Sequence, residues 1–366
     1  MLRRLPGLTD RPIVPAMTTH ALQRFAFHLE AFKTALATAE IVPPETADAV
    51  DPAASGLLGH RLYMANGRTP VFMLQGLARV HRKLDFGADT PAPSTFDRIR
   101  LEAKIVEDII GKTDFWWVIG RKARENKLPA AVIAWAGEKH VEACGEAATW
   151  LRAREWIAHR YLIDQDDFTP RADRLTRKLR KLRWPSPKKL NVALREFLSE
   201  ALRETDDTIE ALDLGNVEHG LHEARRRLRW FSVYATALSG AVILDGEATP
   251  PPNWERYLTP DVVENPFNRL PTPEPTDRPV SIPAPLFYAL SYVIDRLGRV
   301  KDRAQWTETL SAGLKATGSG RNRSIESYLG ADAMTQAEAG TAATEILEQA
   351  LGEDALLTRM AEAVEG

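Results

Sequence analysis

The stretch that decides the fold is VEHGLHEARRRLRWFSVYATALSGAVIL, residues 217–244. Its apolar residues recur every three or four positions, which is the spacing of one face of an α-helix. The residues of this face are Leu221, Ala224, Leu228, Phe231, Ala235 and Leu238. The sequence therefore predicts a helix over the whole stretch, with this face in the core.

The same helix carries cationic residues away from its apolar face. His222, Arg225, Arg226 and Arg229 are spaced by three and four residues, so they share one side. Arginine offers a forked, permanently charged set of donors that matches phosphate oxygens, and histidine adds a charge that depends on pH near neutrality. The alternative is a solvated side whose arginines pair with carboxylates of adjoining helices. Both interpretations stay open on this pattern.

Other segments repeat the helical spacing. The predicted helices cover residues 19–37, 73–86, 96–110, 129–162, 190–212, a stretch from 286 past 306, and 335–363. Strand patterns are scarce, so a parallel sheet with a nucleotide crevice is not expected. The predicted fold class is all-α, built as a set of helical bundles.

A basic segment occupies residues 171–189. Nine lysines and arginines stand there against one acid, Asp173, and leucines at helical spacing predict a helix up to Trp184. We expect Arg177, Arg180 and Lys181 to line the second wall of a groove shared with the 217–244 helix. A solvated basic helix or a generic nucleic-acid patch is the alternative.

A proline-rich excursion follows the 217–244 stretch, over residues 246–285. Eleven prolines between positions 250 and 285 rule out a regular helix. We expect helix to resume near Leu286.

Composition limits the remaining choices. The 366 residues include 48 basic and 50 acidic ones, a net charge of −2, and Cys144 is the only cysteine. An internal disulfide and a thiolate zinc site are therefore impossible. The N-terminal lead, residues 1–18, has no apolar core of signal-peptide length, and no apolar run approaches the roughly 20 residues needed to cross a bilayer. We expect a cytoplasmic protein without membrane contact.

Residues 218–229, EHGLHEARRRLR, resemble the signature of the CHAD family, the conserved histidine α-helical domain. In that family a histidine is followed by an arginine three residues on, and then by an Arg-Arg-Leu-Arg run. His219 matches the histidine, residues 226–229 match the run, and His222 stands where the first arginine is usual. Residues 297–302, LGRVKD, are similar to the family's Leu-Gly-x-x-Arg-Asp element, with Lys301 in place of the arginine.

The resemblance implies two related helical bundles and therefore an internal repeat. Residues 75–86 align without gaps on residues 219–230, which pairs Gly76 with Gly220 and Arg82 with Arg226. The first copy has Gln75 and Ala78 where the second has His219 and His222, so its signature is degenerate. The expected division is a first bundle over 19–170, a second over 171–330 and a helical tail over 331–366.

The resemblance also implies binding of inorganic polyphosphate in a basic groove or pore, without cofactor or catalysis. Another polyanion, nucleic acid included, stays open as a partner. The residues predicted to bind it are His219, His222, Arg225, Arg226, Arg227, Arg229, Arg177, Arg180, Lys181 and Lys301.

Three other functions were weighed against anion binding. A metal site at His219 and His222 lacks a third ligand, and the neighbouring arginines oppose a cation. A helical scaffold would pair its arginines with carboxylates and meet a protein partner through the excursion. An enzyme acting on phosphorylated substrates ranks last, because the sequence shows no nucleophile or metal set for it.

Overall fold

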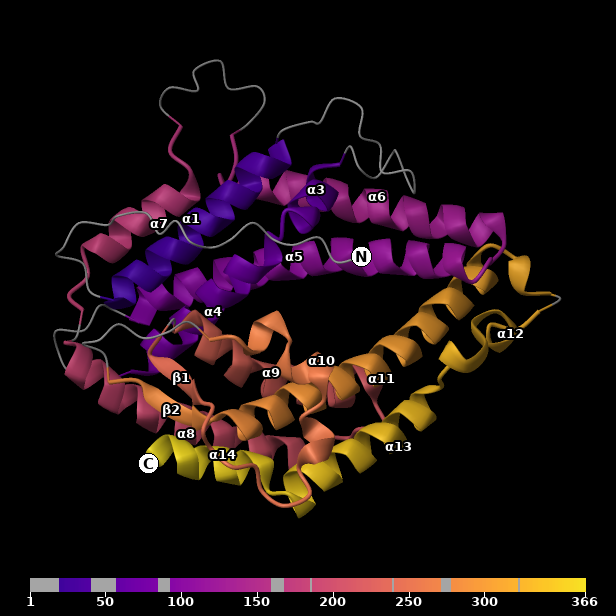
Figure 1. Ribbon diagram of the computed structural model, residues 1–366. Coiled ribbons are helices and arrows are strands. Elements are labelled where there is room, and N and C mark those ends of the chain that lie inside the picture. The colour runs from indigo at the N-terminus through magenta and orange to yellow at the C-terminus, as the bar shows by residue number, and fades with distance from the viewer. Residues whose placement is uncertain are drawn as a thin grey trace.

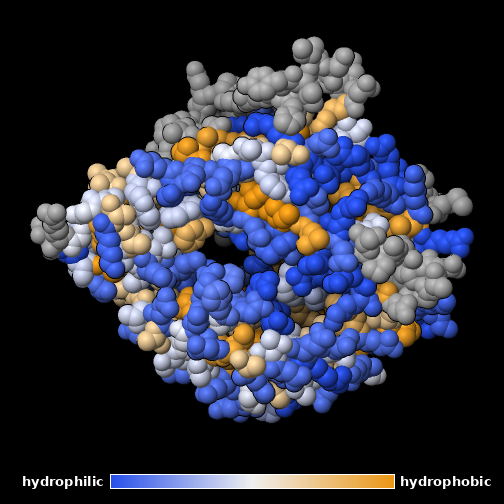
Figure 2. Space-filling model, turned by 180° about the vertical axis from the view of Figure 1, so that it is seen from behind, coloured by the Kyte–Doolittle hydropathy of each residue, from blue (hydrophilic) through white to orange (hydrophobic). Residues whose placement is uncertain are grey.

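The computed structural model describes residues 20–40, 57–84, 93–158, 168–184, 186–238, 240–270, 278–321 and 323–366. The described residues are mostly helical and include one ribbon of two short strands, which confirms the all-α fold class. The predicted N-terminal lead, residues 1–18, lies outside the described residues. Seen from behind, the surface is largely hydrophilic, with a hollow near the centre of that face (Figure 2).

The first part of the chain forms a layer around one long antiparallel helix pair, α5 and α6 (Figure 1). Its helices are α1 (His20–Glu40), α3 (Leu58–Met64), α4 (Arg68–Lys83), α5 (Pro93–Glu125), α6 (Ala130–Ala153) and α7 (Arg171–Arg180). The predicted 96–110 helix is therefore only half of α5. The predicted 129–162 helix ends at Ala153, and its last four residues lie outside the described part of the chain.

The second part begins with α8 (Pro187–Glu210), a π-helical turn (Val217–Leu221) and α9 (His222–Ala237). The long helix α11 (Ala284–Ala316) crosses the molecule to meet α5 and α6 (Figure 1). The tail holds α12 (Glu326–Leu329), α13 (Gln336–Leu347), a π-helical segment (Glu348–Glu353) and α14 (Leu356–Glu365). Single 3-10 turns cover Ser319–Arg321 and Gly330–Asp332.

The end of the 217–244 stretch differs from its prediction. The helix stops at Ala237, and β1 (Val242–Asp245) pairs in parallel with β2 (Val280–Pro283), with Val242 opposite Val280. Gly240 adopts a φ of 78°, the left-handed conformation in which helices commonly end. The β-branched pair that follows it suits a strand. The predicted helix was therefore wrong beyond Ala237.

The described residues of the proline-rich excursion form only short elements before α11 begins at Ala284. They are a 3-10 turn (Glu255–Tyr257), the single-turn α10 (Pro260–Val263), a second 3-10 turn (Pro266–Asn268) and β2. Residues 271–277 lie outside the described part.

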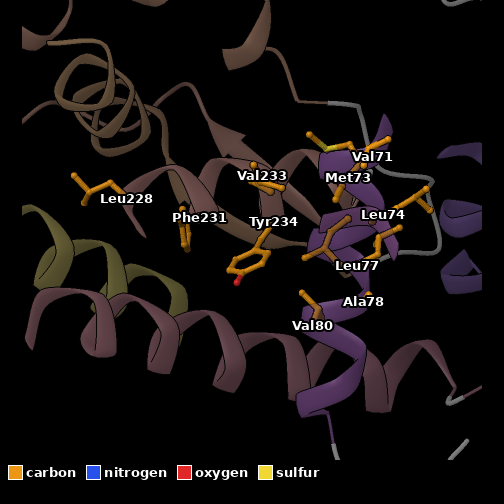
Figure 3. Packing of buried hydrophobic residues seen from close by; sticks show 14 of the residues in the cluster. Val71, Met73, Leu74, Leu77, Ala78, Val80, Leu228, Phe231, Val233 and Tyr234 are labelled. Atoms are coloured by element: carbon orange, nitrogen blue, oxygen red, sulfur yellow. The ribbon is translucent and has the colours of Figure 1, made fainter. Parts of the chain in front are cut away.

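The predicted apolar face of α9 is the core of the molecule. All six of its residues are at most 4% exposed. Val233 and Tyr234 of α9 lie across from α4, whose Leu77 and Met73 belong to the same cluster (Figure 3). That cluster joins residues of α1, α4, α8, α9, α11 and α14, so it runs through both predicted bundles.

Candidate functional site

The signature segment opens with a π-helical turn whose glycine is required by its surroundings. Asn216 caps the turn, because its side-chain oxygen accepts a hydrogen bond from the His219 backbone N–H at 2.9 Å. A Cβ on Gly220 would lie 1.8 Å from the carbonyl oxygen of Asp213. Only glycine allows this approach of the two backbones. His219 itself is exposed.

Two signature arginines share one carboxylate. Arg226 Nε donates to Glu223 Oε2 at 2.7 Å, and Arg227 Nε donates to Oε1 at 2.8 Å. Arg225 and Arg229 have other partners, in a separate cluster that is described below. The predicted cationic side of the helix is therefore divided between two environments.

A cavity of about 210 Å³ lies beside Arg226 and Arg227. Its walls come from α4, α5, α8 and α9. We call it the cationic cavity; its lining residues are Arg79, Arg82, Lys83, Arg100, Phe197, Ala201, Glu204, Thr205, Glu223, Arg226, Arg227, Trp230, Phe231 and Tyr234. Six cationic side chains thus face two carboxylates. Arg82, Lys83 and Glu204 are exposed, so the cavity opens to solvent on their side.

Arg79 is the least compensated cation of this cavity. Its guanidinium carbon lies 4.1 Å from the centroid of the Trp230 ring, and its Nε is buried without a hydrogen-bond partner. Among the described residues, no carboxylate lies within ion-pair distance of it. Burial lowers the pKa of Arg79, the neighbouring Tyr234 hydroxyl partly offsets this effect, and the charges of Arg100 and Arg226 lower the pKa further. Arginine keeps its charge at neutral pH, so an anion in the cavity would relieve this repulsion.

The other cavity cations have partial compensation. Arg82 Nε lies 2.8 Å from Asp97 Oδ1, and Arg100 Nε lies 3.7 Å from the same oxygen. Lys83 Nζ lies 3.1 Å from both carboxylate oxygens of Glu204. With Asp97 counted, three carboxylates face six cations. The cavity therefore keeps an excess of positive charge.

Arg225 and Arg229 belong to a second group, which we call the inner cluster: His222, Arg225, Arg229, Arg68 and Lys301. Arg225 Nε donates to the Ile294 carbonyl at 3.2 Å and packs against Gly298, where a Cβ would lie 2.8 Å from that nitrogen. Gly298, the glycine of the 297–302 element, therefore leaves room for the guanidinium of Arg225.

An aromatic ring joins two arginines of the inner cluster. The guanidinium carbons of Arg229 and Arg68 lie 4.0 and 5.3 Å from the centroid of Phe72. Arg68 also pairs with two carboxylates of α5, with Glu107 at 3.0 Å and with Asp114 at 3.0 Å. Gly111 leaves room for it, since a Cβ there would lie 3.1 Å from Arg68 Nη2.

Burial changes the titration of the inner cluster. It lowers the pKa of His222, and the nearby Lys301 lowers it further, so this histidine is neutral at pH 7. Burial, with the charges of Arg225 and Arg68, lowers the pKa of Arg229 to about 10. Lys301 Nζ lies 2.8 Å from Asp302. The cluster thus connects α4, α5, α9 and α11, with Arg68 and Lys301 paired to carboxylates and Arg229 packed on the Phe72 ring.

The basic segment occupies a different part of the surface. Helix α7 packs on α1 and buries Leu175 and Leu179, while Arg177, Arg180 and Lys181 are exposed. None of these three lines the cationic cavity. The walls that face α9 come from α4, α5 and α8 instead of from this segment.

Four cations of the cavity were missing from the predicted site: Arg79, Arg82, Lys83 and Arg100. The internal repeat held a signal for two of them, because it pairs Arg82 with Arg226 and Lys83 with Arg227. Both pairs line the cavity. The two helices that the repeat equates pack against each other, and a Cβ on Gly76 would lie 3.0 Å from Val233.

Metal ligands and membrane spans were sought in the same residues. Within the described ranges, no three histidine, cysteine or acidic side chains are placed to hold a metal ion. No helix in those ranges has the length and apolar character to cross a bilayer. No family model matches the chain, and comparisons with curated proteins and with solved structures give no significant match.

Proposed function

We propose that the chain binds a phosphate-bearing polyanion, inorganic polyphosphate, in the cationic cavity and does so without catalysis. The observation that carries this proposal is Arg79, a guanidinium held on Trp230 with an unpartnered Nε and with two more arginines close enough to lower its pKa. Arg79 is half-buried, and a partly desolvated cation without a carboxylate is costly unless an anion joins it.

The walls of the cavity favour a phosphate chain. Forked guanidinium donors from α4, α5 and α9 match phosphoryl oxygens. Since the helices fix these donors before binding, little side-chain entropy is lost. The resemblance of residues 218–229 to the CHAD signature supports the same ligand class. A volume of about 210 Å³ holds a few water-sized groups and cannot admit a nucleic-acid duplex.

Calorimetric titration with tripolyphosphate tests the proposal. We expect Arg79→Gln to weaken binding about tenfold or more, because one charge-assisted contact in a shielded cavity is lost. Arg177→Gln removes the same charge from the exposed face of α7 and should change affinity less than twofold. Binding should weaken as salt rises, and short double-stranded DNA should not compete. Equal losses in both variants, or no binding at low salt, would contradict the proposal.

A second candidate is a helical scaffold for a protein partner. Two observations favour it: Glu223 already pairs with Arg226 and Arg227, and the excursion exposes Val263 and Phe267, the latter at 68%. Exposed apolar side chains close together are typical of protein contacts. This candidate predicts no affinity for tripolyphosphate at low salt.

A further inference from the structure

Two carboxylates sit among the cations of the cavity. Glu223 accepts from two guanidinium groups, with Arg226 Nε and Nη2 both 2.7 Å from Oε2 and with Arg227 Nε 2.8 Å from Oε1. Glu204, on α8, lies with both oxygens 3.1 Å from Lys83 Nζ. Both carboxylates line the cavity itself.

These carboxylate oxygens occupy positions that phosphoryl oxygens would take. Arginine binds carboxylate and phosphate with the same forked donors, so the two anions compete for one set of N–H groups. An incoming anion must displace Glu223 from its arginines or share them with it. Sharing brings two negative charges together, which lowers affinity.

We propose that Glu223 and Glu204 are internal competitors that limit the affinity of the cavity for linked phosphates, an inference that rests on the proposed function. A single phosphoryl group can engage Arg79 but gains too little to displace a carboxylate as well. A chain of phosphoryl groups engages Arg79 and then replaces Glu223 on Arg226 and Arg227. The free energy of this displacement therefore weakens binding of the chain more than binding of a single group.

A positioning role for Glu223 would change the affinity in the opposite direction. If Glu223 only positioned Arg226 and Arg227 for the ligand, its removal would loosen both arginines and weaken binding. The sign of the change in affinity thus separates a competitor from a positioning residue.

The test uses Glu223→Gln and Glu204→Gln, titrated separately with orthophosphate and with tripolyphosphate. Glutamine keeps the shape of the side chain and removes its charge. We expect Glu223→Gln to tighten tripolyphosphate binding about fivefold and orthophosphate binding less, since only the chain displaces this carboxylate and an ion pair of ordinary strength contributes at most about that factor. The ratio of the tripolyphosphate affinity to the orthophosphate affinity should rise. Glu204→Gln should act in the same direction but more weakly, because this glutamate is exposed.

The matched control is Glu218→Gln. Glu218 is exposed on the π-helical turn and does not line the cavity, so the same loss of charge should change affinity less than twofold at physiological salt. Weaker or unchanged binding in both cavity variants, each shown to be folded by circular dichroism, would overturn the competitor role. If the wild-type chain and all variants bind neither anion, the proposed function fails as well.

Discussion

Two arginines that pack on aromatic rings beside α9, Arg79 and Arg229, have different surroundings. Arg79 lies 4.1 Å from the ring of Trp230 on the cavity side, and Arg229 lies 4.0 Å from the ring of Phe72 on the side of the inner cluster. Around Arg229, the neighbouring Arg68 is held by Glu107 and Asp114. Around Arg79, the neighbouring cations outnumber the carboxylates and face a cavity. The local charge balance, more than the arginine itself, therefore distinguishes the two surroundings, and the proposal of anion binding in the cavity rests on this difference.

Acid should destabilise the whole fold, and so the cavity and the inner cluster together. Burial lowers the pKa of His28 and His81 to about 3. The unfolded chain therefore binds more protons below a pH of about 6.5, so the free energy of unfolding is highest above that pH and falls as pH decreases toward 3. We expect a loss of about 4 kcal/mol from the two histidines between pH 7 and pH 5.

Urea unfolding at several pH values measures this loss. His81 lies among the rings of Phe25, Phe96 and Trp184, so His81→Phe should remove roughly half of the pH dependence. Stability that does not change between pH 7 and pH 5 would show that these histidines are not buried as neutral groups.

The substitution Gly220→Ala should destabilise both the cavity and the inner cluster, because Gly220 lies in the π-helical turn that leads into α9. The new Cβ would meet the Asp213 carbonyl oxygen, a backbone atom that no rotamer change can move. We expect a loss of about 3 kcal/mol, at the upper end of the usual cost of overpacking. Thermal unfolding gives the measurement. Gly145→Ala is the control, because a Cβ there meets nothing within 4 Å; a loss as small as in this control would contradict the close approach.

The substitution Glu107→Gln should affect the inner cluster alone. Glu107 pairs with Arg68 at 3.0 Å and with Lys104 at 3.1 Å, and its side chain is 12% exposed. Removing its charge should cost about 1–2 kcal/mol, less than for a fully buried pair because Arg68 keeps Asp114. The exposed Glu138→Gln should cost under about 0.5 kcal/mol. Tripolyphosphate affinity should stay within twofold in both variants. A larger fall in Glu107→Gln would show that the inner cluster contributes to anion binding.

The sequence predicts the core of this fold better than its edges. The apolar face from Leu221 to Leu238 is buried as expected, since helical spacing is a local property of the chain. The sequence predicts helix where β1 forms, because the partner of Val242, Val280, lies 38 positions away along the chain. A strand that depends on a distant partner leaves little local trace.

The candidate site shows the same limit. Helical spacing places His222 with the arginines. Only the packing of α9 against α11 buries this histidine and brings Lys301 close, and both effects lower its pKa. Arg79 and Arg100 line the cavity only because α4 and α5 come together with α9. No single segment of the sequence shows this arrangement. The repeat that pairs Arg82 with Arg226 was the one sequence feature that pointed across this contact.

The most direct test of the central claim compares Arg79→Gln with Arg229→Gln in calorimetric titrations with tripolyphosphate at low salt. Both substitutions remove one guanidinium from an aromatic ring, from Trp230 in the cavity wall and from Phe72 in the inner cluster. We predict a loss of affinity of about tenfold or more in Arg79→Gln and less than twofold in Arg229→Gln, whose cost should appear in thermal stability instead. The reverse order, or equal losses of affinity, would contradict the assignment of anion binding to the cationic cavity.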